Sequence, residues 1–463
     1  MRNFFLFLFL LGSFRSSFAQ FDKIELENKI HDSLEWLANA QEKETVGDSI
    51  FRGEWPSTMG LKNRFLYLGK AIPFRDSNCF TQANVFNTLA EIYLKDSSKK
   101  EILPMLELAL PELLSYRDSL TFNFWKKLEP NIPLSRKEPH PENYLAHRPT
   151  NFELKTRFIN NAADIANDAD DTSTGNLALF YANEVFSIKR KIPSQNLYDS
   201  YIDRNRNNYH WFNYIHKIPR PSNAYMTWLA PEVQFKHWSF PWQVAHNLVF
   251  FLPASSCFPH PYDSYVPWGA NDIDAVVNCN VLNFLAKTGQ LEESLGKEGA
   301  VNLLKYVVGK ERWSRAGIYY PNRFYIHYTI SKVYPYFLEE LAHEANILKM
   351  HLISSQNMDG SFFSRKKVNK KDVLQSTVYA LEAMLNLKEA GVEIPKENID
   401  KALEFILTHE IRDDKGIHWN GGVFFSGGTV VRNALYFKSD AYTTALVAQA
   451  IQKYLALFYG ELE

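Results

Sequence analysis

Residues 164–181 read DIANDADDTSTGNLALFY and join an acidic cluster to the start of an apolar helix. Asp168, Asp170 and Asp171 all fall within residues 168–171. One interpretation is a helix N-terminus, because Asp, Ser and Thr cap free N–H groups and the helix dipole favours acids in the first turn. The other is a general acid, because carboxylates this close raise one another's pKa until one holds a proton at neutral pH.

The chain opens with MRNFFLFLFLLGSFRSSFAQ, which has the features of a secretory signal peptide over residues 1–19. Arg2 supplies the positive start, and residues 4–11 form an apolar run too short to span a bilayer. Ser17-Phe18-Ala19 matches a small-x-small cleavage pattern. We therefore expect a secreted or periplasmic protein whose mature chain has no transmembrane segment.

Composition excludes several classes of function. The 51 Lys and Arg residues balance 52 Asp and Glu residues, and no basic run is present, so no nucleic-acid partner is expected. The three cysteines, Cys79, Cys257 and Cys279, permit at most one disulfide, and their pairing stays open. No C-x-x-C or H-E-x-x-H motif occurs, so we expect neither a metal nor a cofactor.

Helical periodicity dominates, and the predicted helices fall into two alternating sets. One set begins with a polar cluster and is then apolar on most faces, at residues 77–79, 168–172, 271–274, 325–327, 372–377 and 439–444. The other set is amphipathic, as in residues 291–308 and 396–409. Helices that are apolar all round are buried, whereas amphipathic helices face solvent. This alternation predicts an all-α fold, a single (α/α)6 toroid over residues 20–463, in which the polar clusters ring one mouth. An irregular, aromatic-rich insertion is expected at about 189–270.

A second repeat accompanies the helices. LANAQ (37–41) precedes RGEW (52–55), LISSQNMDGSF covers residues 352–362, and FILTHEIRDDKGIHW covers residues 405–419. These segments resemble the QW-type repeats of the terpene cyclase and protein prenyltransferase superfamily. The resemblance implies an α6–α6 toroid.

The acidic stretch strengthens this resemblance. Asp168-Ala169-Asp170-Asp171-Thr172 is similar to the D-x-D-D-T motif of class II terpene cyclases. The resemblance implies that Asp170 protonates an isoprenoid-type substrate, with Asp168 and Asp171 as tuning partners. Aromatic side chains would then stabilise the resulting carbocation, because π faces attract cations.

Other polar residues at the predicted mouth are candidates for substrate binding, although each could equally be a helix cap or a core residue. They are Asn271, Asp272, Asp274, Asn278, Tyr325, His327, Asp372, Gln375, Asp440 and Tyr442. Trp238, Trp242, Trp268 and Trp419 are candidate stacking platforms.

Two alternatives to a cyclase remain open from these residues. The first is an extracytoplasmic glycan-active hydrolase or lyase that uses the mouth carboxylates with Tyr325 or His327. The second is a non-catalytic protein that binds a small molecule or a glycan at the same mouth.

Overall fold

The computed structural model describes residues 21–61, 73–131, 142–152, 163–204, 218, 221–233, 266–267, 271–364, 372–427 and 435–460. The predicted signal peptide, Trp238, Trp242, Trp268 and Cys257 lie outside these ranges. Of the predicted insertion at about 189–270, the structure describes only parts, which include one short helix and one short parallel strand pair.

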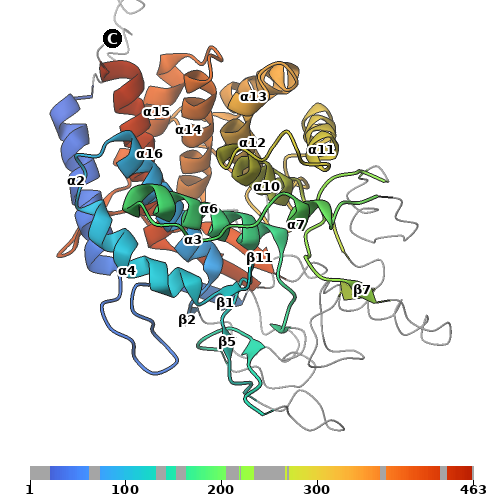
Figure 1. The fold of residues 1–463 in the computed structure, drawn as a ribbon. Helices are drawn as coiled ribbons and strands as arrows, with labels where there is room; N and C mark the ends of the chain where they lie inside the picture. Colours follow the sequence, from blue (N-terminus) through green and yellow to red (C-terminus); the bar gives the residue numbers. More distant parts are fainter. Residues whose placement is uncertain are drawn as a thin grey trace, which may run out of the picture.

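Within the described residues, six largely buried helices form a closed ring (Figure 1). They are α3 (Cys79–Lys95), α6 (Ala169–Phe186), α10 (Ala275–Lys287), α12 (Tyr325–Val333), α14 (Val373–Glu389) and α16 (Asp440–Tyr459). Each helix packs against the next along the chain, and α16 returns to α3. The predicted toroid is confirmed, and its inner helices begin where the polar clusters predict them.

An outer helix precedes each inner helix along the chain. The outer set is α2 (Lys23–Ala40), α4 (Ile102–Leu114), α7 (Asn196–Asp199), α11 (Lys297–Gly309), α13 (Ala342–Ser355) and α15 (Lys396–Leu407). A 3-10 turn, η2 (Tyr334–Tyr336), follows α12. The helix α7 has only one turn, so the hairpin before α10 has a much reduced outer layer.

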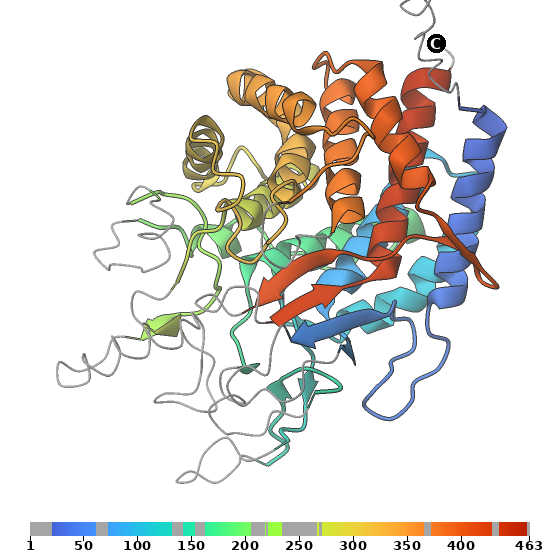
Figure 2. The same cartoon turned by 180° about the vertical axis from the view of Figure 1, so that it is seen from behind.

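The ring closes because the first helix packs against the last part of the chain (Figure 2). Lys29 Nζ lies 2.5 Å from Glu410 Oε2, and Arg412 pairs with Asp32 at 3.0 Å. Gly416 has a φ of +131°, and a Cβ at this position would stand 2.6 Å from the Asp32 carbonyl oxygen on α2. Only glycine therefore allows this close approach.

The repeat segments form the same contacts at several places in the ring. Trp55 donates its indole N–H to the Leu37 carbonyl at the end of α2, and Trp419 donates to Ile406 at the end of α15, at 3.1 and 2.8 Å. Their backbone N–H groups donate to the side chains of Gln82 on α3 and Thr444 on α16. Each repeat aromatic thus joins an outer helix to the following inner helix.

A four-stranded antiparallel sheet crosses the ends at which the inner helices begin. It has the order β11 (Val423–Gly427), β12 (Leu435–Lys438), β1 (Ser57–Leu61) and β2 (Phe74–Asp76), with Met59 opposite Phe437. Four further pairs are short: β3 (Arg117–Asp118) with β4 (Thr121–Phe122), β5 (Lys127–Leu128) with β6 (Ala146–His147), β7 (Glu232–Val233) with β8 (Val266–Pro267), and β9 (Ile411–Asp413) with β10 (Gly416–His418). The sequence predicted none of these strands.

Buried charges fill the interior near the opposite end of the ring. Lys453 Nζ lies 2.5 Å from Glu382 Oε2 and 2.7 Å from Asn386 Oδ1. Glu91 accepts hydrogen bonds from Tyr181 and Gln449, both at 2.7 Å. These side chains come from α3, α6, α14 and α16, so a polar network joins the inner helices at this end.

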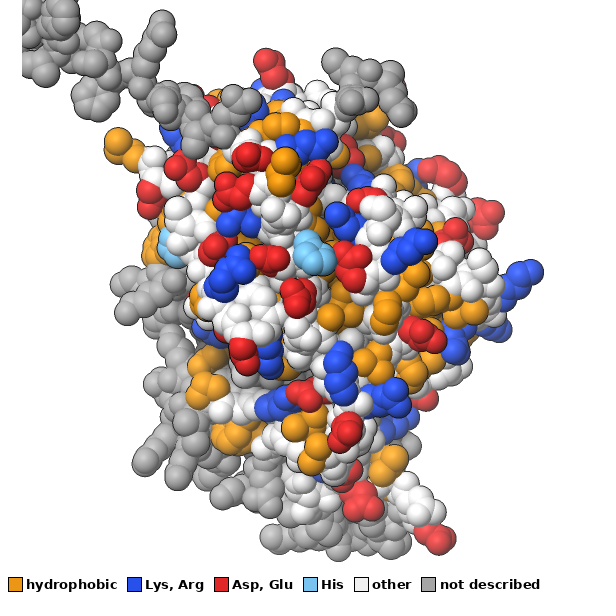
Figure 3. All heavy atoms as spheres, turned by 90° about the vertical axis from the view of Figure 1, so that its left-hand side faces the viewer, with side chains coloured by type: hydrophobic (Ala, Val, Ile, Leu, Met, Phe, Trp, Pro, Cys, Tyr) orange, Lys and Arg blue, Asp and Glu red, His pale blue; other side chains and the backbone are white. Residues whose placement is uncertain are grey.

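The outer surface carries both signs of charge. On the face formed by the left side of Figure 1, positive and negative side chains are intermingled, as Figure 3 shows. Among the helices of the described ranges, none has the length and apolar character needed to cross a membrane.

Candidate functional site

The acidic stretch forms the N-terminus of α6 at the mouth of the ring. Asp168 is the cap residue, and its Oδ1 accepts a hydrogen bond from the backbone N–H of Asp171 at 2.8 Å. Asp170 and Asp171 occupy the first turn, and all three side chains are buried. Asp168 is therefore the helix cap, while Asp170 and Asp171 stand beside it in the interior.

Asp170 is held by side chains from two distant segments. Its Oδ1 accepts a hydrogen bond from Asn280 Nδ2 on α10 at 2.6 Å, and its Oδ2 accepts one from the hydroxyl of Tyr320. Burial raises the pKa of Asp170 to about 6, and the hydrogen bonds from Tyr320 and Asn280 limit the rise. The carboxyl group is therefore fixed in orientation and exchanges its proton near neutral pH.

The two neighbouring acids hold protons more firmly. Burial, followed by the charge of Asp170, raises the pKa of Asp168 to about 7. Burial and the charges of Asp168 and Asp170 raise the pKa of Asp171 well above its ordinary value. Asp171 Oδ1 is buried without a hydrogen-bond partner in the described part of the chain. Of the three, Asp170 is the strongest acid, because two donors stabilise its charged form.

The second acidic cluster fixes the loop that carries Tyr320. Asp274 caps α10 and accepts backbone N–H groups of Val276 and Val277 at 2.7 and 3.3 Å. Its other oxygen accepts the N–H groups of Ile318 at 2.5 Å and Tyr319 at 3.3 Å. Four backbone donors thus surround this carboxylate, and it positions the segment that delivers the Tyr320 hydroxyl.

Asn271 and Asn278 have a related role. Each side chain exchanges two hydrogen bonds with one backbone residue, Trp228 for Asn271 and Tyr225 for Asn278, at 2.8–3.0 Å. Both amides are buried. These contacts hold residues 225–228 against α10, so the structure gives the two asparagines a supporting position.

Asp272 differs from Asn271 and Asp274 because only one of its two carboxyl oxygens accepts a hydrogen bond within the described ranges. The hydroxyl of Tyr319 donates to its Oδ2 at 2.5 Å, while Oδ1 is buried and has no partner among the residues described. Burial raises the pKa of Asp272 to about 7. The mouth therefore contains two separate buried acids with raised pKa values, each bonded to one of two consecutive tyrosines.

Aromatic rings fill the space beside Asp170. Tyr320 stacks on Tyr325 with ring centroids 4.5 Å apart, and Phe80 stacks on Phe424 at 4.8 Å. Further aromatic contacts extend across the mouth through Phe124, Tyr319, Tyr379, Phe425, Phe437 and Tyr442. The hydroxyls of Tyr379 and Tyr442 are buried without a partner of good geometry in the described ranges. The acid cluster thus faces an aromatic interior.

Three of the candidate binding residues attach the sheet to the mouth. Asp372 Oδ2 accepts the N–H of Val423 at 3.0 Å, and Gln375 Oε1 accepts the N–H of Gly422 at 3.1 Å. Asp440 is exposed and accepts the N–H of Gly421 at 2.6 Å. These residues therefore place β11, and with it Phe424, over the ring.

His327 and Trp419 lie away from the mouth interior. His327 Nε2 is 2.8 Å from Nδ1 of His351 on the outer helix α13, so its ring points outward. Burial and the neighbouring His351 lower the pKa of His327 well below its ordinary value. Trp419 is fully buried against α15, and it is therefore a packing residue, with no exposed face for stacking.

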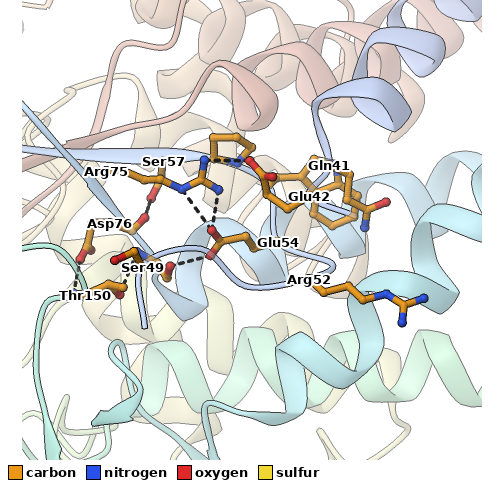
Figure 4. A network of polar contacts seen from close by, with 12 residues as sticks. Gln41, Glu42, Ser49, Arg52, Glu54, Ser57, Arg75, Asp76 and Thr150 are labelled. Atoms are coloured by element: carbon orange, nitrogen blue, oxygen red, sulfur yellow. Dashed lines mark hydrogen bonds and ion pairs between the residues drawn. The ribbon is translucent and has the colours of Figure 1, made fainter. Parts of the chain in front are cut away.

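A sixth buried acid lies at the edge of the mouth, where β2 leads into α3 (Figure 4). Asp76 accepts the backbone N–H of Thr150 and the indole N–H of Trp125, both at 3.1 Å, and burial raises its pKa to about 7. Next to it, Arg75 bridges Glu42 and Glu54 at 2.8 and 2.5 Å. These contacts secure β2 to the first repeat.

Sequence reasoning missed the two residues that hold Asp170. Tyr320 lies 150 positions from Asp170 along the chain, and Asn280 lies 110 positions away. A weak local signal existed only for Asn280, which is one of three asparagines in a largely apolar helix. The search for metal ligands found no group of three or more His, Cys, Asp or Glu side chains among the residues described.

Comparison with known proteins supports the fold. No family model matches the chain, and no curated protein sequence matches it. Among solved structures, the type II terpene cyclase MstE from Scytonema has a TM-score of 0.51 at 12% identity, over 92% of this chain and 97% of the cyclase. A protein from Actinoplanes gives 0.51 at 10% identity, over 92% and 99%.

A further match is cellobiose 2-epimerase from Bacillus thermoamylovorans, with a TM-score of 0.49 at 10% identity, over 92% and 98%. The cyclase is an α/α toroid protein, and this chain has the same fold. At this level of identity, the likeness concerns the fold alone.

Proposed function

We propose that this protein is a class II terpene cyclase-like enzyme in which Asp170 protonates a carbon–carbon double bond of an isoprenoid. The observation that carries the proposal is the pair of hydrogen bonds to Asp170 from Tyr320 and Asn280. They orient a buried carboxyl group whose pKa of about 6 permits proton donation near neutral pH.

The chemistry balances without a cofactor. The O–H bond of Asp170 breaks, and its proton forms a C–H bond with one alkene carbon, which leaves a carbocation on the other. The π electrons of a second double bond then form a C–C bond and close a ring. Loss of a proton from the final cation regenerates an alkene, so the product is an isomer of the substrate.

The surroundings of Asp170 suit a cationic intermediate. The aromatic rings of Phe80, Tyr325 and Phe424 belong to the aromatic cluster beside Asp170. Ring faces attract a cation by roughly 0.5–2 kcal/mol each. The buried Asp168 and Asp171 hold protons nearby, from which Asp170 regains its own after each turnover.

The solved structures of similar fold support the proposal in a general way. The MstE structures include one with geranylgeranyl dihydroxybenzoate as substrate and one with merosterolic acid A as product. Because the present chain covers 97% of such a cyclase, a single toroid is large enough for this chemistry. A linear isoprenoid joined to an aromatic head is thus a reasonable first probe.

The glycan-active alternative has less support. Its proposed base or acid His327 points toward α13, and Trp419 is buried. Tyr325 stays available at the mouth, but it stacks on Tyr320 within the aromatic interior. A hydrated sugar polymer would require an open, polar surface at this place.

The direct test is incubation of the purified protein with geranylgeranyl dihydroxybenzoate and with squalene in D2O. We expect a cyclic product that carries one deuterium, since Asp170 exchanges its proton with solvent before it donates. Asp170→Asn should abolish product, because an amide keeps the shape and cannot protonate an alkene.

The matched control is Asp414→Asn, a change at an exposed aspartate in the turn between β9 and β10. It should form product at the wild-type rate. Equal turnover by wild type and Asp170→Asn would refute the role of Asp170, and the absence of cyclised product from all linear isoprenoids tried would refute the proposed function.

A further inference from the structure

A separate cleft lies outside the ring, beside the segment that leads into α6. Its volume is about 470 Å³, which falls within the usual range for small-molecule sites. Three stretches of chain form most of it: residues 143–147 on and before β6, residues 164–167 before α6, and residues 229–231. Asp118 and Lys127 complete the lining. Neither the proposed cyclase chemistry nor the predicted mouth residues use this cleft.

A tyrosine, an aspartate and a histidine meet on its wall. Asp164 accepts a hydrogen bond from the hydroxyl of Tyr144 and another from the backbone N–H of His147 at 2.9 Å. His147 Nδ1 lies 3.3 Å from Asp164 Oδ1. Both Asp164 and His147 are more than nine-tenths buried, so their relative position is fixed by the fold.

This arrangement determines which histidine nitrogen is left for a ligand. Nδ1 is buried 3.3 Å from the Asp164 carboxylate, without the alignment of a hydrogen bond. This nearby charge favours the tautomer that carries its proton on Nδ1, which leaves Nε2 as an acceptor. Within the described ranges Nε2 of His147 forms no hydrogen bond, and the residue lines the cleft. The imidazole therefore offers a fixed, unused lone pair at the cleft.

The rest of the lining points to an uncharged, polar ligand. Asn143 and Asn167 add amide groups, while Leu229 and Ala230 provide an apolar wall. The cation on the lining, Lys127, already pairs with Asp118 at 2.8 Å, so it is not free to hold a phosphate or a carboxylate. An apolar wall opposite hydroxyl, amide and carboxylate groups matches a sugar ring, which has C–H faces and hydroxyl edges.

We propose that this cleft is a second binding site, which takes a neutral sugar-sized polyol and accepts one ligand hydroxyl at His147 Nε2. Tyr144 and Asp164 act as positioning residues for the imidazole. The site is independent of the isoprenoid chemistry at Asp170, so either proposal can fail without the other.

The test is saturation-transfer NMR and isothermal titration calorimetry on the purified protein with D-glucose, D-galactose, D-mannose and N-acetylglucosamine. We expect at least one of these sugars to bind in the millimolar range. Asp164→Asn, which keeps the side-chain shape, and His147→Ala should each weaken binding by about tenfold or more, since a buried polar group loses its partner.

Two further variants keep the test decisive if His147→Ala folds poorly. His147→Gln retains an acceptor oxygen and should restore part of the affinity. His409→Gln, a change at an exposed histidine near the end of α15, should leave affinity unchanged. Failure of every sugar to bind at concentrations up to roughly 50 mM, or binding that is equal in wild type and Asp164→Asn, would overturn the proposal.

Discussion

At the scale of single residues, the central feature is that three neighbouring carboxyl groups differ in their hydrogen-bond partners and in their pKa values. Asp170 receives two side-chain hydrogen bonds, whereas one Asp171 oxygen has no hydrogen-bond partner among the residues described. Burial raises the pKa of both, and the hydrogen bonds from Tyr320 and Asn280 limit the rise at Asp170, while the charges of Asp168 and Asp170 add to the rise at Asp171. The fold thus selects one strong acid from three adjacent aspartates.

Tyr320→Phe tests this selection. Loss of the hydroxyl removes a hydrogen bond that lowers the pKa of Asp170, so that pKa should rise by about one unit above 6. A general acid works only while protonated, so the rate of isoprenoid isomerisation should fall as pH rises through this pKa. We expect the falling limb of the variant's pH profile to move to higher pH. Identical midpoints for wild type and variant would rule out Tyr320 as a positioning residue.

Asp272→Asn tests how much folding stability the protein loses when the second buried acid is ionised. The folded-state pKa of about 7 lies above the unfolded value near 3.9, so the folded state binds more protons between these pH values. The contribution of Asp272 to stability is therefore complete below about pH 4 and is lost as pH rises through 7. Asparagine mimics the neutral acid.

The variant and wild type should thus be equally stable near pH 4, and the variant should be more stable by roughly 4 kcal/mol at pH 8, since each pKa unit between 3.9 and 7 is worth about 1.4 kcal/mol. Urea unfolding followed by circular dichroism at both pH values measures this. A wild-type advantage that stays constant with pH would contradict the assignment of a protonated Asp272.

At the scale of elements, some glycines allow close contacts within the repeat, because a backbone carbonyl lies where a side chain would otherwise stand. Gly360 has a φ of +84°, and a Cβ there would stand 2.1 Å from the Lys401 carbonyl oxygen on α15. Gly391 has nearly the same φ, +88°, with no atom within 4 Å. Substitution of these two glycines therefore distinguishes the energetic cost of backbone strain from that of close packing.

Gly391→Ala should cost about 1–2 kcal/mol, the strain of a left-handed residue. Gly360→Ala should cost clearly more, roughly 3 kcal/mol or above, because the helix α15 must also move. Thermal unfolding of both variants gives the comparison. Equal losses would mean that the outer helices are not packed through this glycine.

The elements also show how far sequence can predict this structure. Asp168, Asp274 and Ser439 cap the helices that the sequence predicts, because capping and helical periodicity are local signals. The sheet escaped prediction because its strands have three to five residues and pair across the whole chain, as Thr58 does with Lys438.

The candidate site was predicted only in part for the same reason. The acids at 168–171 are adjacent in sequence, but Tyr320 and Asn280 reach them through the closure of the ring. His327 lies on an inner helix, as predicted, yet its ring faces α13, since the start of a helix does not determine which way each side chain points.

At the scale of the whole molecule, the two ends of the toroid differ in the chemistry of their buried side chains. Aromatic rings and raised-pKa acids occupy the mouth, while paired charges occupy the opposite end. Lys332 and Lys453 hold the pKa of Glu91 below its usual range despite its burial. These paired charges join inner helices that are far apart in the sequence.

Lys453→Met tests this network. Glu382 is fully buried, and the change would remove the ammonium group that lies 2.5 Å from its carboxylate. Removal of one partner of a buried ion pair typically costs about 3–5 kcal/mol. We expect a loss of that size in chemical unfolding, and most of it should return in the double variant Lys453→Met/Glu382→Gln. A single variant as stable as wild type would show that the pair does not support the ring.

The central claim, that Asp170 stores and delivers a proton, is tested most directly by the titration of its carboxyl carbon. Carbon-13 NMR of aspartate-labelled protein, with Asp170→Asn to assign the signal, would follow the chemical shift from pH 3 to pH 9. The account predicts a midpoint near 6, well above the ordinary value of about 3.9. A midpoint at or below 3.9 would mean that Asp170 is a permanently charged helix-end residue, and it would contradict a proton-donating role.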